Sequence, residues 1–113
     1  MKTVLLIEDE LSLQNILSAY FRKNEFKVIA ASDGLEGLEK YRENHIDIIC
    51  CDVMMPNIDG WEVVRSIRQY SKVPIILMTA LDSEIDQLKG FNLEVDDYIT
   101  KPFSPSILIA KVN

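Results

Sequence analysis

Acidic residues follow two apolar runs of this sequence. Glu8 and Asp9 come directly after the run at residues 4–7, and Asp52 follows the run at residues 46–51. If both runs are neighbouring strands of a parallel sheet, their carboxyl ends meet at one edge and bring these carboxylates together. Like charges at short range raise one another's pKa unless a cation lies among them. The spacing therefore predicts a site for a divalent cation.

A hydroxyl and an ammonium group are predicted at the same edge. Thr79 ends the apolar run at residues 75–78, and Lys101 follows a short run at residues 98–100. A carboxylate can attack phosphorus and form an aspartyl phosphate, and phosphoryl transfer needs positioning and charge neutralisation more than proton transfer. We therefore interpret Asp52, on the central strand, as the nucleophile, with Thr79 and Lys101 available to hold phosphoryl oxygens.

The predicted cation is Mg²⁺. Glu8, Asp9 and Asp52 offer hard oxygen ligands, and Mg²⁺ binds through few carboxylates, retains several waters and often bridges to phosphate. Zinc prefers histidine or cysteine, and the single histidine, His45, lies at the opposite end of its strand. Taken singly, each acid has a structural interpretation, because acids also favour helix N-termini. Their joint placement at successive strand ends favours the site.

Apolar runs alternate with amphipathic segments along the whole chain, which predicts a doubly wound α/β fold. We expect a five-stranded parallel sheet in the order 2-1-3-4-5, with helices on both faces and right-handed crossovers. The expected strands are residues 3–7, 27–31, 46–51, 74–79 and 97–100. Helices are expected between them, including a weak one at residues 83–90, and a last helix begins at Ser104-Pro105.

Helix caps and inner faces follow from local patterns. Ser32-Asp33-Gly34 begins one helical segment, and Asp59 precedes the next one and is suited to cap it. Apolar residues at helical spacing predict three inner faces, namely Leu13, Ile16, Leu17, Tyr20 and Phe21; Leu35, Leu38 and Tyr41; and Val63, Val64, Ile67 and Tyr70.

Length and charge limit the classes of function. The 113 residues suit one domain. Twelve basic and eighteen acidic residues give a net charge of −6, which argues against binding of nucleic acid or of an anionic membrane by this segment. No apolar run approaches the roughly 20 residues of a membrane span, so we expect a cytoplasmic location. The adjacent Cys50 and Cys51 exclude a disulfide framework.

At these residues the chain resembles the response-regulator receiver domains of two-component signalling, over residues 1–113. The motifs are Ile7-Glu8-Asp9-Glu10, Asp52-Val53-Met54-Met55-Pro56-Asn57-Ile58-Asp59-Gly60, Met78-Thr79-Ala80, and Asp96-Asp97-Tyr98-Ile99-Thr100-Lys101-Pro102-Phe103. The last of these motifs, with the residues that continue it, most resembles the OmpR/PhoB subfamily.

The resemblance implies a phosphoacceptor and a metal site. Asp52 would accept the phosphoryl group. Mg²⁺ would bind Asp9 directly, Glu8 mostly through water, Asp52, and the backbone carbonyl of Met54.

The resemblance also implies the residues that respond to phosphorylation. Thr79 and Tyr98 would form a switch pair, and Ala80 and Lys101 would contribute to the phosphoryl-binding part of the site. The bond between Lys101 and Pro102 would be cis.

The expected partner is a sensor histidine kinase, which would donate the phosphoryl group. Members of the subfamily dimerise through their fourth helix, fifth strand and fifth helix, and a winged-helix DNA-binding domain follows the receiver. Because the chain stops inside its last helix at Asn113, we expect a longer protein. The resemblance implies that a DNA-binding output domain follows. The sparse apolar face of residues 83–90 suits an element of low local stability that moves in switching.

Three other classes compete with this interpretation. A flavin-binding module shares the architecture, but acids after the first strand would repel the flavin phosphate. An aspartate-dependent phosphatase usually has a second acid two residues after its nucleophile, where this chain has Met54, so we expect no enzyme with multiple turnovers. A receiver-like interaction module that works without phosphorylation is the closest alternative, and the complete set of site residues argues against it.

Overall fold

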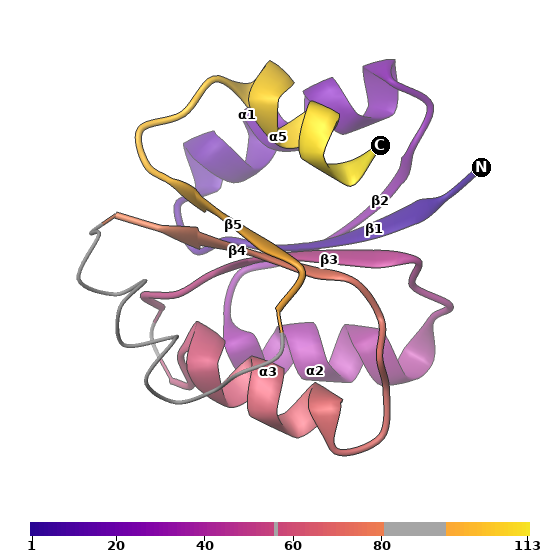
Figure 1. Ribbon diagram of the computed structural model, residues 1–113, viewed down its shortest axis with the longest axis vertical. Helices are drawn as coiled ribbons and strands as arrows, with labels where there is room; N and C mark the ends of the chain where they lie inside the picture. The colour runs from indigo at the N-terminus through magenta and orange to yellow at the C-terminus, as the bar shows by residue number, and fades with distance from the viewer. Residues whose placement is uncertain (56, 81–94) are drawn as a thin grey trace.

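The computed structural model describes residues 1–55, 57–80 and 95–113. Within them, one parallel sheet has the strand order β2-β1-β3-β4-β5, as Figure 1 shows. The predicted doubly wound fold is therefore confirmed. The strands are β1 (Thr3–Ile7), β2 (Lys27–Ala31), β3 (Ile48–Asp52), β4 (Ile75–Thr79) and β5 (Asp97–Thr100).

Two strand boundaries differ slightly from the prediction. The strand β3 begins at Ile48 and includes Asp52, whereas residues 46–51 were expected, and β4 begins at Ile75, directly after Pro74. Every residue of β1, β3 and β4 is buried, as is usual for central strands covered on both faces. Their apolar composition follows from that burial.

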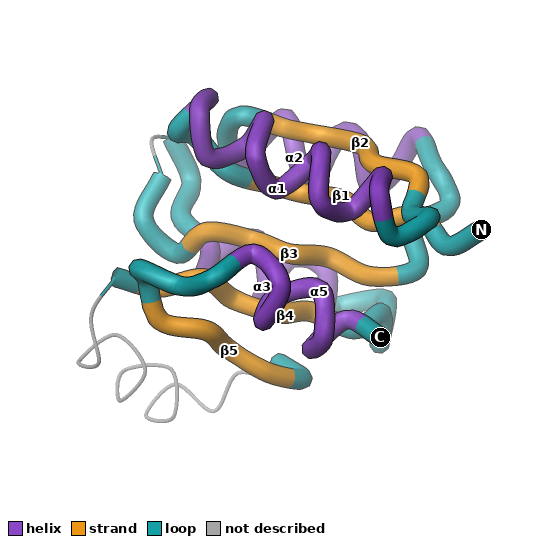
Figure 2. Tube along the Cα trace, turned by 90° about the horizontal axis from the view of Figure 1, so that it is seen from above, coloured by secondary structure: helices purple, strands orange, loops and turns teal. Residues whose placement is uncertain are grey.

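Helices cover both faces of the sheet (Figures 1 and 2). The helices α1 (Leu11–Lys23) and α5 (Pro105–Val112) lie on one face, and α2 (Gly34–Glu43) and α3 (Gly60–Arg68) lie on the other. Alternate residues of each strand point to the two faces, so Leu5 and Ile7 join the hydrophobic cluster under α2 and α3, while Val4 and Leu6 join the one under α1 and α5. The helix predicted at residues 83–90 lies outside the described residues.

The inner face of α1 is only partly as predicted. Leu17 and Phe21 are buried, but Ile16 and Tyr20 are 49% and 41% exposed. A polar side chain takes one inner position instead: the amide nitrogen of Gln14 donates hydrogen bonds of 3.0 and 3.1 Å to backbone carbonyls at the ends of β1 and β2. Because Gln14 turns inward to satisfy these carbonyls, the buried stripe is rotated away from Ile16 and Tyr20.

The inner face of α2 is also only partly as predicted, and Tyr41 packs against the hydrophobic cluster while partly buried. Leu38 is buried as predicted, but Leu35 is 54% exposed. Gly34 and Gly37 face the sheet instead. A Cβ atom at Gly37 would lie 2.4 Å from the Cδ1 atom of Ile7, so a larger residue there would require the Ile7 side chain to move.

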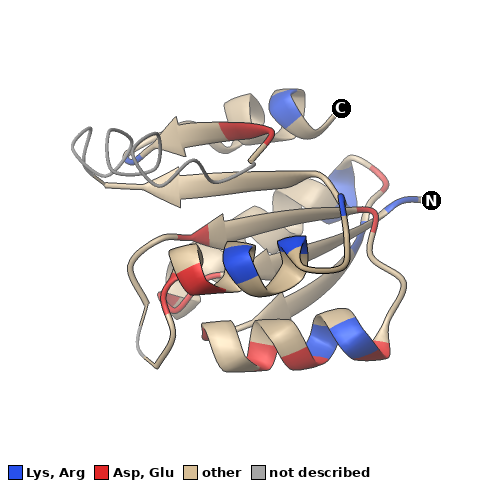
Figure 3. Ribbon diagram, turned by 60° about the horizontal axis from the view of Figure 1, so that its bottom comes forward, with Lys and Arg blue, Asp and Glu red and all other residues tan. Residues whose placement is uncertain are grey.

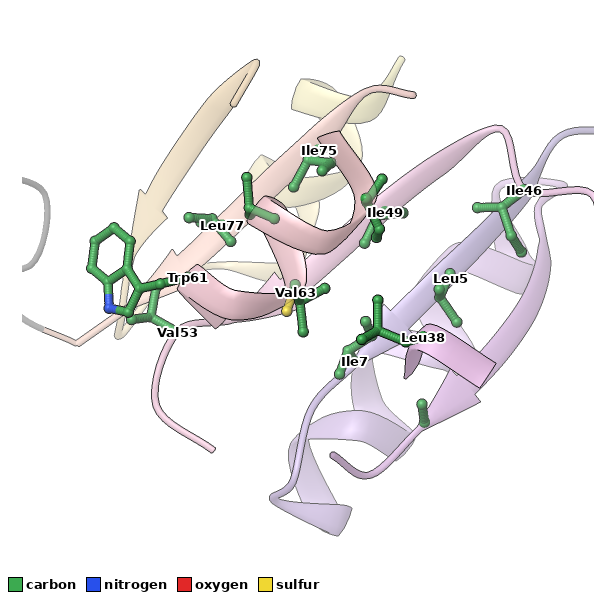
Figure 4. Close-up of a cluster of buried hydrophobic side chains, with 14 residues drawn as sticks. Leu5, Ile7, Leu38, Ile46, Ile49, Val53, Trp61, Val63, Ile75 and Leu77 are labelled. Carbon is green, nitrogen blue, oxygen red and sulfur yellow. The ribbon is translucent and has the colours of Figure 1, made fainter. Parts of the chain in front are cut away.

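The helix α3 covers the same face of the sheet, as the close-up in Figure 4 shows. Asp59 caps it as predicted, accepting a 3.1 Å hydrogen bond from the backbone N–H of Glu62. Tyr70 was expected inside but is 59% exposed, because the helix ends at Arg68. Trp61 is buried against the end of β3 in addition to the predicted inner residues Val63, Val64 and Ile67.

The helices α2 and α3 have charged residues on their outer surfaces. Figure 3 shows acidic and basic residues interspersed along the outward sides of α2 and α3. Among the described residues, no helix combines the length and the hydropathy that crossing a membrane requires.

Candidate functional site

The acidic residues meet at the carboxyl end of the sheet. The parallel register pairs Ile7 with Cys51, so Glu8 and Asp52 extend from the same level of adjacent strands. One oxygen atom of Glu8, one of Asp9 and one of Asp52 lie within 4.8 Å of one another. Glu8 is completely buried, Asp52 is 5% exposed and Asp9 is exposed. The carboxylates therefore form a pocket that is closed on the β1–β3 side and open to solvent at Asp9.

A lysine side chain enters this pocket from the end of β5. The ammonium of Lys101 donates hydrogen bonds of 2.9 Å to Oε1 of Glu8 and 3.1 Å to Oδ2 of Asp52. Its backbone N–H donates to the carbonyl of Thr79 at 2.7 Å, which ties the residue to the end of β4. The Lys101–Pro102 peptide bond is cis. The ammonium thus lies between two carboxylates that would otherwise repel each other.

The electrostatics of Asp52 reflect these neighbours. Burial, together with the nearby charge of Glu8, raises the pKa of Asp52 to about 7, and the Lys101 ammonium opposes that rise. Burial lowers the pKa of Lys101, but its hydrogen bond to Glu8 and the charges of both carboxylates outweigh this effect, so its pKa is raised. Lys101 is therefore a fixed positive charge, whereas folding disfavours the ionised form of Asp52.

This raised pKa has a consequence for stability in magnesium-free buffer. The pKa of Asp52 rises from 3.8 to about 7 on folding, so at intermediate pH the folded protein retains a proton that the unfolded chain has lost. Stability from this group is greatest below pH 3.8 and falls as the pH approaches 7. We expect Asp52→Asn to remove that decline. In thermal unfolding with EDTA, the variant should match the wild type near pH 4 and unfold several degrees higher near pH 8. A variant that is less stable than the wild type at pH 8 would contradict this.

The remaining predicted residues differ in burial. Thr79 is buried at the end of β4, and Ala80, the next residue, is exposed. Tyr98 is half-buried and packs against the hydrophobic cluster under α2 and α3. The backbone N–H of Met54 donates a long, 3.4 Å hydrogen bond to Oδ1 of Asp52. The structure therefore brings Glu8, Asp9, Asp52 and Lys101 together, whereas the Tyr98 side chain packs against the hydrophobic cluster and the Met54 side chain is exposed.

Gly60 also shapes the pocket, although we did not predict a role for it. A Cβ atom there would lie 2.6 Å from the carbonyl oxygen of Asp52 and 2.8 Å from the Cα atom of Val53. Both are backbone atoms, which cannot move aside cheaply. The glycine allows the first turn of α3 to lie against the strand end that bears Asp52. The signal for this role was present, since a glycine directly follows the helix cap at Asp59.

A shallow groove leads away from the pocket along α1. It encloses about 460 Å³ between the start of α1 and the segment that joins β5 to α5. Its walls are Glu10, Ser12, Leu13, Ile16, Ala80, Lys101, Pro102 and Phe103. Lys101 thus borders both the carboxylate pocket and this groove.

The donor set fits a small, hard divalent cation. The pocket offers carboxylate oxygens from Glu8, Asp9 and Asp52, which are ligands that Mg²⁺ accepts. The exposure of Asp9 leaves room for retained water. Both cysteines are unsuitable as ligands, because burial raises the pKa of Cys50 to about 12 and that of Cys51 well above its usual value.

Comparison with known proteins identifies the family. The model of the response regulator receiver domain matches residues 4–113. The chain is 44% identical over 109 residues to the uncharacterized transcriptional regulatory protein YclJ of Bacillus subtilis (strain 168), which covers 96% of this chain and 48% of that protein. The chain therefore belongs to the family of response-regulator receiver domains, of the OmpR/PhoB type.

Solved structures agree with this assignment. The receiver domain of the Francisella response regulator 1452 is 35% identical, with a TM-score of 0.92, over all of this chain and 94% of that one. The response regulator TrrA of Thermotoga maritima, solved in complex with Mg²⁺–BeF, is 31% identical, with a TM-score of 0.89, over 99% of this chain and 96% of that one. The chain spans about half the length of the curated relatives it matches.

Proposed function

We propose that this receiver domain is switched by phosphorylation of Asp52, with a sensor histidine kinase as the donor. The observation that carries the proposal is the pocket itself: carboxylate oxygens of Glu8, Asp9 and Asp52 within 4.8 Å, with the Lys101 ammonium 2.9 Å from Glu8 and 3.1 Å from Asp52. This arrangement holds a nucleophilic carboxylate, a cation site and a fixed positive charge at one point.

The side chains divide the chemistry between them. An oxygen of Asp52 attacks phosphorus, forming the P–O bond of an acyl phosphate while the bond to the donor breaks. The carboxylates of Glu8, Asp9 and Asp52 and the carbonyl of Met54 would hold Mg²⁺, which neutralises charge on the phosphoryl oxygens. The Mg²⁺–BeF complex of the related TrrA supports this assignment. The Lys101 ammonium then donates a hydrogen bond to a phosphoryl oxygen in place of one to a carboxylate oxygen.

The response involves the residues around the pocket. The Thr79 hydroxyl moves to a phosphoryl oxygen, next to the backbone of Ala80, and Tyr98 turns further inward from its half-buried position. The surface of β5 and α5, together with the helix expected at residues 83–90, changes as a result and favours a homodimer. In the longer, cytoplasmic protein that we propose, this change controls a DNA-binding output domain and thereby transcription. The receiver itself turns over no substrate in multiple cycles.

Chemical labelling tests the proposed function directly. Incubation with acetyl phosphate and Mg²⁺ should add the mass of one phosphoryl group to the intact protein. Hydroxylamine should remove it, because it cleaves acyl phosphates but leaves phosphate esters of serine and threonine intact. EDTA should prevent its formation. An unchanged mass at saturating Mg²⁺ and acetyl phosphate would contradict the proposal and favour an interaction module that works without phosphorylation.

A further inference from the structure

The loop that follows the phosphoacceptor is held by a contact with a different helix. The side-chain amide of Asn57 donates a 3.1 Å hydrogen bond to Oδ2 of Asp33. The other oxygen of Asp33, Oδ1, accepts a 2.8 Å hydrogen bond from the backbone N–H of Glu36 and caps α2. One carboxylate thus joins the start of α2 to the loop between β3 and α3.

The next residue of the loop is anchored at the same place. A Cβ atom at Gly34 would lie 2.5 Å from Cγ1 and 2.6 Å from the carbonyl oxygen of Ile58, so this loop backbone lies directly on the first residue of α2. Asn57 has a φ of 70°, in the left-handed region that few residues other than glycine and asparagine adopt readily. Asn57 and Ile58 therefore contact the start of α2 at two adjacent points, and Asn57 has an unusual backbone conformation there.

The same loop contains the backbone that would contribute to the cation site. Met54 donates its N–H to Asp52 at 3.4 Å, and its carbonyl is the proposed backbone ligand. Toward α3, the N–H of Gly60 donates to the carbonyl of Val53 at 2.8 Å, which fixes the base of the loop. The Asn57–Asp33 contact holds the loop on its outer side.

We propose that Asn57 and Asp33 are positioning residues for the cation site: their hydrogen bond sets the loop so that the Met54 carbonyl is available to the ion. This inference rests on the proposed function. Contacts outside the ligand set commonly change metal affinity without changing the ligands themselves. The pair should therefore affect how tightly Mg²⁺ binds, and leave the phosphoryl transfer at Asp52 unchanged once the ion is bound.

Two substitutions at Asn57 separate this role from a purely structural one. Asn57→Gly removes the side chain but tolerates the positive φ. Asn57→Asp keeps the shape but places a carboxylate against Asp33. Mg²⁺ affinity, measured by calorimetry on the purified protein, should fall roughly tenfold in both variants. Asn57→Asp is the sharper test, because its additional negative charge would by simple attraction tighten cation binding.

A double substitution should restore the hydrogen bond and with it the Mg²⁺ affinity. In Asp33→Asn with Asn57→Asp, donor and acceptor are exchanged, the net charge is that of the wild type, and asparagine still caps α2. This variant should regain wild-type Mg²⁺ affinity. In labelling by acetyl phosphate, the single variants should need a higher Mg²⁺ concentration for half-maximal rate and reach the wild-type rate at saturation.

Two results would overturn the positioning role. Wild-type Mg²⁺ affinity in both single variants would do so, as would a double variant that binds no better than Asn57→Asp. Either result leaves the proposed function intact if the wild type binds Mg²⁺ and is phosphorylated. A wild type without measurable Mg²⁺ binding would overturn this inference and the proposed function together.

Discussion

Replacing Asp52 by asparagine should abolish phosphorylation by acetyl phosphate. The amide has no nucleophilic carboxylate oxygen. Asp52 ends the central strand, 3.1 Å from the Lys101 ammonium, whereas the neighbouring Glu8 is completely buried. The expected result is complete loss of the added phosphoryl mass in the intact protein, under conditions that label the wild type. The fold should persist, since the substitution removes a charge that folding disfavours.

Asp47→Asn provides the matched control. Asp47 lies at the opposite end of the sheet, where it accepts a 2.7 Å hydrogen bond from the backbone N–H of Thr3, and asparagine retains an acceptor oxygen. This variant should be labelled like the wild type. Phosphoryl mass that persists in Asp52→Asn, and maps to another acidic residue, would refute the assignment of the phosphoacceptor.

Replacing Lys101 by methionine should strongly destabilise the magnesium-free protein. The ammonium is 2.9 Å from the completely buried Glu8 and 3.1 Å from Asp52. Removing one partner of a buried ion pair leaves an uncompensated charge, at a cost of roughly 3–5 kcal/mol. Because the Lys101 side chain is 22% exposed, we expect a loss of unfolding free energy toward the lower end of that range. Urea unfolding in EDTA measures it.

Lys111→Met is the matched control for this loss. Lys111 pairs with Asp97 at 2.8 Å, but the two side chains are 31% and 41% exposed. An exposed pair contributes at most about 1 kcal/mol, so this variant should remain close to the wild type. Saturating Mg²⁺ should restore much of the stability lost in Lys101→Met, because a dication can compensate the same carboxylates. Equal losses in both variants, or no recovery with Mg²⁺, would mean that Lys101 is not the counter-ion of the pocket.

The sequence predicted the sheet well because burial leaves a simple signal. Strands covered on both faces are nearly all apolar. The apolar runs therefore predict the number of strands, their order along the chain and the positions of their carboxyl ends. The helices were harder, because the inner face depends on contacts between distant residues. Gln14 turns inward and donates hydrogen bonds to the carbonyls of Glu8, directly after β1, and of Ala31, at the end of β2. Gly37 faces Ile7 at close range. Neither contact has a local signal in hydrophobic spacing.

The site was predictable at the level of residue types and strand ends. Parallel strands bring their carboxyl ends to one edge, so the sequence alone places the acids and Lys101 together. The hydrogen bond from the Lys101 ammonium to Glu8 was not predicted, because it depends on how far the lysine side chain reaches across β4 and β3. The Asn57–Asp33 contact was also missed, because residues separated by 24 positions meet only through the packing of α2 and α3.

Magnesium titration by calorimetry, without a phosphodonor, tests the central claim that Glu8, Asp9 and Asp52 form one cation pocket. The wild type should bind one Mg²⁺ per chain. Asp9→Asn, which alters the exposed acid of the pocket and so leaves the core undisturbed, should weaken binding at least about tenfold. Glu10→Gln, at the exposed neighbouring acid, should bind as the wild type does. Equal Mg²⁺ affinity in the wild type and Asp9→Asn would contradict the account.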